Sequence, residues 1–306
     1  MTSARTILVT GARGQLGCEL AAALAPYGDV VALDRTALDL THADALRATL
    51  ATHDPALIVN AAAYTAVDRA QADAARAALV NAEAPRIMAE HARGHGALLI
   101  HYSTDYVFDG NAHAPYDEDA PTGPQSVYGA TKLAGEAAIR ASGARALVFR
   151  TSWVYGLRGS NFLLTMRRLA AERDELRIVA DQSGVPNWCR ELARSTARLV
   201  ARGVPYLAER SGLYHMSAAG AATWYEFARA IVGDVERPRV VPITTADYPT
   251  PARRPAYAVL STARFEHTFG FALPHWRASL AECVNSPAEP PSPGAVGSAP
   301  SSRGDH

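Results

Sequence analysis

The sequence predicts an α/β fold in which a doubly wound parallel sheet is followed by a smaller C-terminal α/β lobe. Two observations support this prediction. Apolar, strand-like runs alternate with Ala-rich helical patterns over roughly the first half of the 306-residue chain, which is typical of parallel strands covered by helices on both faces. Beyond about residue 155 the pattern loosens into helices, short strands and Pro-rich connections, which indicates a second unit.

The first expected strand, residues 6–10, runs directly into a glycine-rich loop and then a helix. Gly11, Gly14 and Gly17 follow the strand at regular spacing. Glycine lets the backbone turn tightly and approach a pyrophosphate, and the N–H groups and dipole of the helix start favour the anion. We interpret this as a Rossmann-type dinucleotide site, although the spacing differs from G-x-G-x-x-G by one residue. The alternative is a tight turn without a ligand.

The second expected strand, residues 30–33, ends at Asp34. This position lies about twenty residues beyond the loop, where a carboxylate can bind the adenosine ribose of NADH. Arg35 follows, and a guanidinium there can pair with the 2′-phosphate of NADPH. The sequence therefore predicts NADH or NADPH without choosing between them. In the alternative interpretation, Asp34 only caps a turn.

Three further strands are expected at residues 56–60, 97–103 and 146–151. Polar residues follow each of them. Because ligands bind beyond the carboxyl ends of parallel strands, these residues are expected to share one cleft with the glycine loop.

This pattern divides the chain into three parts. Residues 1–155 are expected to form mainly a dinucleotide-binding domain, to which later segments can return, and residues 156–285 mainly a substrate-binding lobe. Residues 286–306 are rich in Pro, Gly, Ser and Ala, which predicts a disordered tail.

Tyr128 and Lys132 are spaced by four residues and therefore share one face of a helix. A cation beside a phenol favours the phenolate and lowers its pKa, so such a tyrosine can exchange protons at neutral pH. On its own the pair is more typical of a surface lysine beside a half-buried tyrosine on an amphipathic helix. Together with the glycine loop, it predicts a nicotinamide-dependent carbonyl reductase.

Composition excludes several other classes. Lys and Arg together number 30, as do Asp and Glu together. The sequence contains no basic stripe, which argues against a nucleic acid partner. No run approaches the length of a membrane span and no signal peptide is evident, so we expect a soluble, cytoplasmic protein. Cys18, Cys189 and Cys283 lack metal-binding spacing and are expected to be reduced thiols.

Four stretches extend these motifs into a family resemblance. They are residues 59–68 (VNAAAYTAVD), 101–108 (HYSTDYVF), 127–136 (VYGATKLAGE) and 149–155 (FRTSWVY). With weaker matches at 212–215 and 248–255, they resemble the extended short-chain dehydrogenase/reductases from about residue 6 to 280. The resemblance implies NADPH- or NADH-dependent reduction of the C4 keto group of dTDP-4-dehydro-L-rhamnose to dTDP-L-rhamnose. Two alternatives stay open: a sister reductase of another 4-keto-6-deoxy nucleotide sugar or of opposite C4 configuration, and a non-catalytic nucleotide-binding regulatory subunit.

The resemblance also implies roles for individual residues. Tyr128 is the general acid, Lys132 lowers its pKa and binds the nicotinamide ribose, and Thr104 bonds the substrate oxygen or Tyr128. Asp105 and Trp153 contact the sugar, although a core role for Trp153 and a capping role for Asp105 are alternatives. Implied cofactor contacts are Gly14, Gln15, Leu16, Asp39, Leu40, Ala63, Tyr64, Thr65 and Tyr102, besides Gly11, Gly17, Asp34 and Arg35. Arg253 and Arg254 are candidates for the nucleotide phosphates, with solvated surface residues as the alternative.

Some positions depart from the family pattern. Tyr64 stands where the family often has His, and Arg254-Pro255-Ala256-Tyr257 departs from Arg-Pro-x-Asn, which affects nucleotide contacts. The resemblance implies a homodimer in which carboxylates hold Mg²⁺: Glu19 and Glu191 match two of the positions, and Glu282 is the candidate for the third. The alternative is that these glutamates are solvated helix residues, because hard cations need several oxygen ligands.

Overall fold

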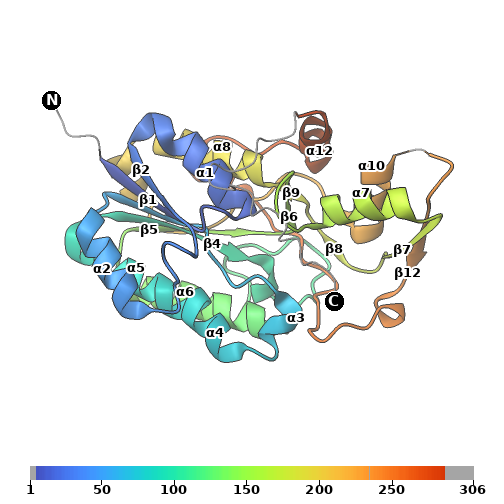
Figure 1. Cartoon of the computed structure of the whole chain (residues 1–306), viewed down its shortest axis with the longest axis horizontal. Helices are drawn as coiled ribbons and strands as arrows, with labels where there is room; N and C mark the ends of the chain where they lie inside the picture. Colours follow the sequence, from blue (N-terminus) through green and yellow to red (C-terminus); the bar gives the residue numbers. More distant parts are fainter. Residues whose placement is uncertain (1–4, 234, 287–306) are drawn as a thin grey trace, which may run out of the picture.

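The computed structural model describes residues 5–233 and 235–286. The predicted tail, except Ser286, lies outside the described residues. A six-stranded parallel sheet in the order β10-β5-β4-β3-β1-β2 forms the centre of the molecule (Figure 1). Its strands are β1 (Thr6–Thr10), β2 (Asp29–Leu33), β3 (Leu57–Asn60), β4 (Leu98–Thr104), β5 (Ala146–Thr151) and β10 (Gly212–His215). The predicted doubly wound parallel fold is confirmed.

Two helical layers cover the sheet, and the strands alternate between them. Ile7 and Val9 of β1 pack into one hydrophobic cluster, whereas Leu8 between them packs into the other. The same alternation holds in β3, β4 and β5. Strands buried on both faces explain why the sequence shows continuous apolar runs here.

The helices of the two layers come from different parts of the chain (Figure 1). One layer contains α1 (Gln15–Leu24) packed against α8 (Cys189–Val200), with α12 (Trp276–Asn285) near them. The opposite layer contains α2 (Ala43–His53) and α6 (Val127–Ser142), which both contact α5 (Ala84–His95), with the short α3 (Val67–Ala70), α4 (Ala74–Ala78) and a π-helical turn (Leu79–Glu83).

The chain order places a ligand site at the middle of the sheet. From β1 the chain passes to β2 on one side, then crosses back so that β3 lies on the other side of β1. The connections diverge at this point, and a crevice opens beyond the carboxyl ends of β1 and β3. The glycine loop follows β1 at this point.

The later part of the chain builds a smaller lobe beside these strand ends. It contains a parallel pair, β7 (Glu175–Val179) and β12 (Arg239–Ile243), packed against α10 (Trp224–Val232). β10 and α8 also come from the later part of the chain, but they pack on the first sheet. The remaining α-helices and strands of the described residues are α7 (Phe162–Glu172), α9 (Val204–Ala208), α11 (Ala263–Phe269), β6 (Val154–Tyr155), β8 (Ser183–Gly184), β9 (Asn187–Trp188) and β11 (Ala222–Thr223).

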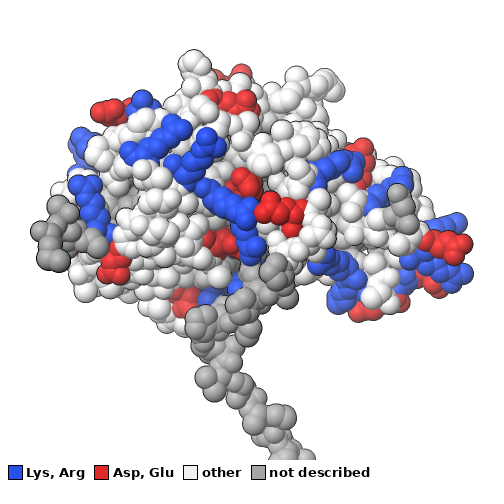
Figure 2. Space-filling model, turned by 90° about the horizontal axis from the view of Figure 1, so that it is seen from above, with Lys and Arg blue, Asp and Glu red and all other residues white. Residues whose placement is uncertain are grey.

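Charged side chains of both signs are interspersed on the face shown in Figure 2. Among the described residues, Arg190 pairs with Glu19 and Arg194 pairs with Glu282. This arrangement agrees with the formal net charge of zero. Within residues 5–233 and 235–286, no helix is both long enough and apolar enough to cross a membrane.

Candidate active site

A cleft of about 670 Å³ lies beyond the carboxyl ends of β1, β3, β4 and β5. It brings together most of the residues predicted from the sequence, on segments from the glycine loop to the start of α10. The predicted residues that line it are Gly11, Gly14, Gln15, Leu16, Asp34, Arg35, Asp39, Leu40, Ala63, Tyr64, Thr65, Tyr102, Thr104, Asp105, Tyr128, Lys132 and Trp153. Gly17, Arg253, Arg254, Glu19 and Glu191 are described but lie outside this lining.

The glycine loop forms a cradle at the start of α1. Gly11 has φ +72°, and a Cβ there would lie 2.9 Å from the Ala62 backbone. A Cβ on Gly14, the N-cap residue, would lie 3.1 Å from the Gly11 carbonyl oxygen, and no described side chain caps the helix. The first N–H groups of α1 therefore remain available to a diphosphate, so this end of the cleft fits a dinucleotide.

Gly17 has a different role from the predicted cofactor contact. A Cβ at this position would lie 2.1 Å from the carbonyl oxygen of Gly11. Gly17 thus lets α1 pack closely against the loop.

Asp34 is held by its own turn and by the glycine loop. Its Oδ1 accepts hydrogen bonds from Thr36 N (2.8 Å) and Ala37 N (2.9 Å), and its Oδ2 lies 2.8 Å from Arg13 Nε. Bonds from Thr36 and Ala37 lower the pKa of Asp34. Asp34 therefore caps its turn, as the alternative interpretation expected. Its carboxylate also lines the cleft.

The adenosine end of the cleft also carries two arginines that the sequence analysis missed, Arg13 and Arg76. Arg35 Nε and Arg76 NH2 each lie 3.7 Å from Asp39 Oδ2. Arg13, Arg35 and Arg76 thus place three guanidinium groups beside the carboxylates of Asp34 and Asp39. Arg76 lies on α4 and belongs to no motif, so the sequence alone gave no signal for it.

A buried asparagine on the π-helical turn holds the segment that carries Tyr64. Asn81 Oδ1 accepts from Tyr64 N (2.8 Å), and its Nδ2 donates to Tyr64 O (3.2 Å) and Thr131 Oγ1 (3.1 Å). The Tyr64 hydroxyl itself donates to Asp73 at 3.3 Å. Asn81 therefore fixes residues 63–65 against α6 at the cleft wall.

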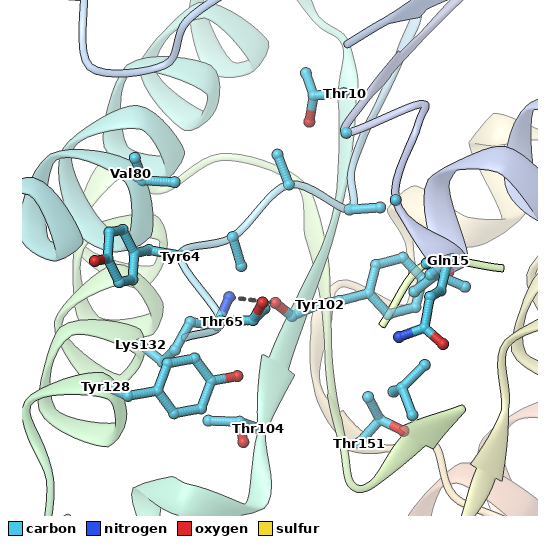
Figure 3. A pocket seen from close by; sticks show the side chains of 18 of the residues that line it. Thr10, Gln15, Tyr64, Thr65, Val80, Tyr102, Thr104, Tyr128, Lys132 and Thr151 are labelled. Carbon is cyan, nitrogen blue, oxygen red and sulfur yellow. Dashed lines mark hydrogen bonds between the residues drawn. The ribbon is translucent and has the colours of Figure 1, made fainter. Parts of the chain in front are cut away.

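Tyr128 and Lys132 lie side by side on α6 and point toward Tyr102 and Thr104 of β4, with Gln15 and Thr151 across the cleft (Figure 3). Lys132 is only 2% exposed, and its Nζ donates to the Tyr102 carbonyl oxygen at 2.5 Å. Burial lowers the pKa of Lys132 to about 8, although Glu136 opposes the shift. The surface-lysine alternative is wrong, because this lysine lies at the base of the cleft.

The expected lowering of the Tyr128 pKa is also wrong. Burial raises the pKa of Tyr128 to about 12; the contact with Thr104 lowers it and the charge of Asp105 raises it. A phenol with this pKa stays protonated at neutral pH. This state suits a proton donor in the direction of reduction.

Asp105 is buried (1% exposed) directly after β4. Its Oδ1 accepts from Thr104 Oγ1 at 3.0 Å, and its Oδ2 has no hydrogen-bond partner among the described residues. Burial raises the pKa of this carboxyl to about 7. The turn after β4 is capped by Thr104, whose Oγ1 accepts from Tyr106 N, and an unpaired carboxyl oxygen of Asp105 remains at the cleft.

We expect Asp105→Asn to stabilise the fold in a pH-dependent manner. The pKa of this carboxyl is raised on folding, so its burial lowers stability as pH rises from about 4 toward 7, with no further loss above that range. The unfolding midpoint of the variant, measured by circular dichroism, should exceed that of the wild type increasingly over this interval. Equal midpoints at all pH values would contradict a buried, neutral Asp105.

Trp153 adopts an unusual backbone conformation at the cleft wall, with φ +41°. Its indole stacks on Trp224 at a centroid distance of 3.5 Å, and a Cβ on Gly184 would lie 2.6 Å from it. Backbone strain of this kind is concentrated at functional sites. The strained backbone and the stacking on Trp224 thus hold the Trp153 indole at the cleft wall. Trp224 also lines the cleft, although no sequence motif indicated it.

Asn161 connects the later part of the chain to the glycine loop. It caps α7 through Leu164 N (3.1 Å), and its Nδ2 donates to Gln15 Oε1 at 2.8 Å. The sequence analysis did not identify Asn161. The contact joins residues far apart in the chain and required the structure.

Arg253 and Arg254 lie between β12 and α11, on a segment that contacts Asp68 of α3. Arg254 forms a bidentate pair with Asp68 (NH2 to Oδ2 2.7 Å, NH1 to Oδ1 3.1 Å). Arg253 is exposed. The pair anchors the segment, and neither arginine lines the described cleft.

The carboxylates expected to hold Mg²⁺ are paired with arginines. Arg190 binds Glu19 in a bidentate manner, while Arg194 lies 2.6 Å from Glu282 and 3.9 Å from Glu191. Among the described residues, potential metal ligands instead gather at Asp54, His91 and His95. The arrangement within this chain therefore does not support the expected Mg²⁺ site.

A dinucleotide cradle at one end of the cleft and a Tyr–Lys pair at the other define a nicotinamide-dependent reductase of the extended short-chain class. The family named RmlD substrate binding domain matches residues 5–288. The chain belongs to this family, which includes dTDP-4-dehydrorhamnose reductases.

Individual relatives agree with this assignment. A dTDP-4-dehydrorhamnose reductase of Burkholderia thailandensis is 48% identical, over 91% of this chain and 97% of the relative. A probable dTDP-4,6-dihydroxy-2-methyloxan-3-one 4-ketoreductase of Streptomyces antibioticus is 46% identical, over 90% and 93%. The structure of dTDP-4-dehydrorhamnose reductase from Bacillus anthracis in complex with NADP is 34% identical and covers 92% of this chain and 99% of that chain, with a TM-score of 0.85.

Proposed function

We propose that this oxidoreductase reduces the C4 keto group of dTDP-4-dehydro-L-rhamnose to give dTDP-L-rhamnose, with NADPH as the preferred donor. The observation that carries the proposal is that the partly buried Tyr128 and the buried Lys132 line the same cleft as the glycine cradle. The family assignment supports the choice of substrate.

The residues present fit a nicotinamide dinucleotide. The α1 N-terminus would hold the diphosphate, Leu40 and Asp39 would border the adenine, and Lys132 would bind the nicotinamide ribose. When bound, the nicotinamide supplies the hydride that adds to C4 of the sugar.

The proton for the reduction would come from Tyr128. Charge develops on the carbonyl oxygen as the C–O double bond becomes a single bond, and the Tyr128 O–H bond breaks as its proton forms the new hydroxyl. The raised pKa of Tyr128 keeps the phenol protonated before this step. Thr104, which is 4% exposed, would orient Tyr128 or the substrate oxygen.

The sugar would be positioned by Asp105 and Trp153. The unpaired Oδ2 of Asp105 offers a hydrogen-bond partner to a sugar hydroxyl. The Trp153 indole presents an apolar face suited to a 6-deoxy methyl group.

The preference for NADPH would come from the arginines at the adenosine end. Asp34 is already bound by its own turn and by Arg13, while Arg35 has a 70% exposed side chain beside the cleft. A guanidinium binds a phosphate with charge-assisted bonds, which NADH cannot form at its 2′-hydroxyl.

We expect Arg35→Ala to raise KM for NADPH about ten-fold, the scale of a lost charged hydrogen bond, while KM for NADH changes little. Initial rates with the two cofactors at saturating substrate measure this difference. Arg47→Ala, which removes an exposed arginine of α2 outside the cleft lining, is the matched control. Equal changes for both cofactors would show that Arg35 does not recognise the 2′-phosphate.

The test of substrate is the rate of NADPH oxidation with dTDP-4-dehydro-L-rhamnose, with the sugar product identified by NMR. Formation of dTDP-L-rhamnose is the expected result. The C4 epimer would instead indicate a sister reductase, which the Streptomyces antibioticus relative makes the second candidate. Tight cofactor binding without turnover of any keto-sugar nucleotide would indicate the regulatory alternative. The cytoplasmic location and homodimeric state stay predictions.

A further inference from the structure

Lys132 is the only lysine in the chain, which also contains 29 arginines. Arginine stays charged at every accessible pH, whereas a buried lysine readily loses its proton. Lys132 is also buried, with 2% of its surface exposed. A lysine at this one position therefore suggests that the neutral amine form has a purpose here.

A buried chain of polar side chains lies behind Lys132. His101 Nε2 lies 3.2 Å from Lys132 Nζ, and His101 Nδ1 lies 3.0 Å from Asn60 Nδ2. Asn60 Oδ1 in turn accepts from Thr10 Oγ1 at 2.7 Å and from Ala62 N at 3.2 Å. Both His101 and Asn60 are fully buried, and none of the chemistry proposed above uses them.

These contacts fix the tautomer of His101. The backbone N–H of Ala62 can only donate, so Asn60 must direct its oxygen toward Ala62 and its NH₂ group toward His101. His101 Nδ1 then accepts from Asn60 and carries no proton. In a neutral imidazole the proton therefore lies on Nε2, which faces Lys132.

An Nε2–H group is a good partner for an amine and a poor one for an ammonium. The amine has a lone pair that accepts the hydrogen bond, whereas the ammonium can only donate. Burial and the charge of Lys132 hold the pKa of His101 well below its usual value, so the ring stays neutral.

We propose that His101 is a positioning residue that holds Lys132 and, through the tautomer imposed by Asn60, stabilises its neutral amine form. The other groups that act on Lys132 lie on α6 and β4. Tyr128 lies one helical turn away, the Tyr102 carbonyl accepts from Nζ, and Glu136 favours the ammonium. Glu136 is itself bound by Arg150 at 2.7 Å, which reduces its pull on Lys132.

The consequence for the reaction rests on the proposed function. Each turnover removes a proton from Tyr128, and a lysine that gains and loses a proton near neutral pH can help to restore it. Proton transfer is most effective when the pKa of the donor lies near the working pH. His101 and Asn60 would thus place Lys132 in the useful range, in the same direction as its burial.

The single lysine makes this inference directly measurable. Protein labelled with ¹³C at the lysine Cε carbon gives one lysine resonance, whose shift with pH reports the pKa of Lys132 without substrate or turnover. Two variants alter the tautomer: Asn60→Ser removes the lock on His101 without adding charge, and Asn60→Asp accepts from an Nδ1–H group. We expect the pKa of Lys132 to rise by about one unit in N60S and further in N60D. In these variants the proton of His101 can move to Nδ1, so that Nε2 no longer donates to the neutral amine of Lys132 but accepts a hydrogen bond from its ammonium form.

An unchanged pKa of Lys132 in both variants would overturn the tautomer mechanism. A rise in N60D alone would also overturn it, because that rise would reflect only the negative charge of the introduced aspartate. A second measurement needs no Asn60 variant. The ¹⁵N shifts of the His101 ring in the wild-type protein, assigned by their loss in His101→Gln, should show Nε2 protonated and Nδ1 unprotonated. The opposite tautomer would contradict the proposal, whereas failure to oxidise NADPH would bear only on the proposed function.

Discussion

Tyr128→Phe should lower kcat by about 100-fold or more while leaving the affinity for the cofactor nearly unchanged, because it removes only the hydroxyl that would donate the proton. The ring remains, so its edge contact with Tyr106 and the packing of α6 persist. Steady-state rates and a fluorescence titration with NADPH measure the two quantities.

A structural control separates loss of chemistry from loss of fold. Tyr116→Phe removes another partly buried hydroxyl, which binds Asp109 at 2.6 Å outside the cleft lining. We expect this variant to lose stability but to keep most of its kcat. A Tyr128→Phe enzyme with near wild-type turnover would show that another group supplies the proton.

Lys132→Met should have the second large effect. It removes the amine that binds Tyr102 O and faces His101, while it leaves a side chain of similar length in the buried site. We expect kcat to fall by about 100-fold, the scale of a lost proton-transfer partner, and the dissociation constant of NADPH to rise as the ribose loses its contact. The same rate and titration measurements apply.

Lys132→Arg tests whether charge alone is sufficient. A guanidinium cannot lose its proton and is larger than the space around a side chain that is 2% exposed. We therefore expect its kcat to fall about as far as that of Lys132→Met, with additional destabilisation of about 1–3 kcal/mol from overpacking. Retention of kcat in Lys132→Arg would show that a fixed positive charge meets the whole requirement.

Much of the fold could be predicted from the sequence because the buried strands are local signals. Residues 6–10 and 146–151 were expected as strands and are β1 and β5 with the same bounds. The sequence did not indicate that β10 belongs to the main sheet. The strand has only four residues, two of them buried, and so short a pattern does not distinguish a sheet strand from other short segments. Its place beside β5 depends on contacts between residues far apart in the chain.

The candidate site shows the same division. The glycine loop and the Tyr–Lys pair could be found because their spacing reflects local geometry. The protonation states could not, because burial decides them: the structure raises the pKa of Tyr128, where the adjacent lysine alone suggested a decrease. The tautomer of His101 likewise depends on Asn60 and Ala62, which lie on a different strand and the loop after it.

The most direct test of the central claim is the fate of deuterium from NADPH labelled at C4 of the nicotinamide, with dTDP-4-dehydro-L-rhamnose as substrate. The account predicts that deuterium appears at C4 of dTDP-L-rhamnose, seen as the loss of the H4 signal in the NMR spectrum, and that Tyr128→Phe abolishes most of this transfer. Oxidation that leaves C4 unlabelled, or no oxidation by an enzyme that binds NADPH, would contradict it.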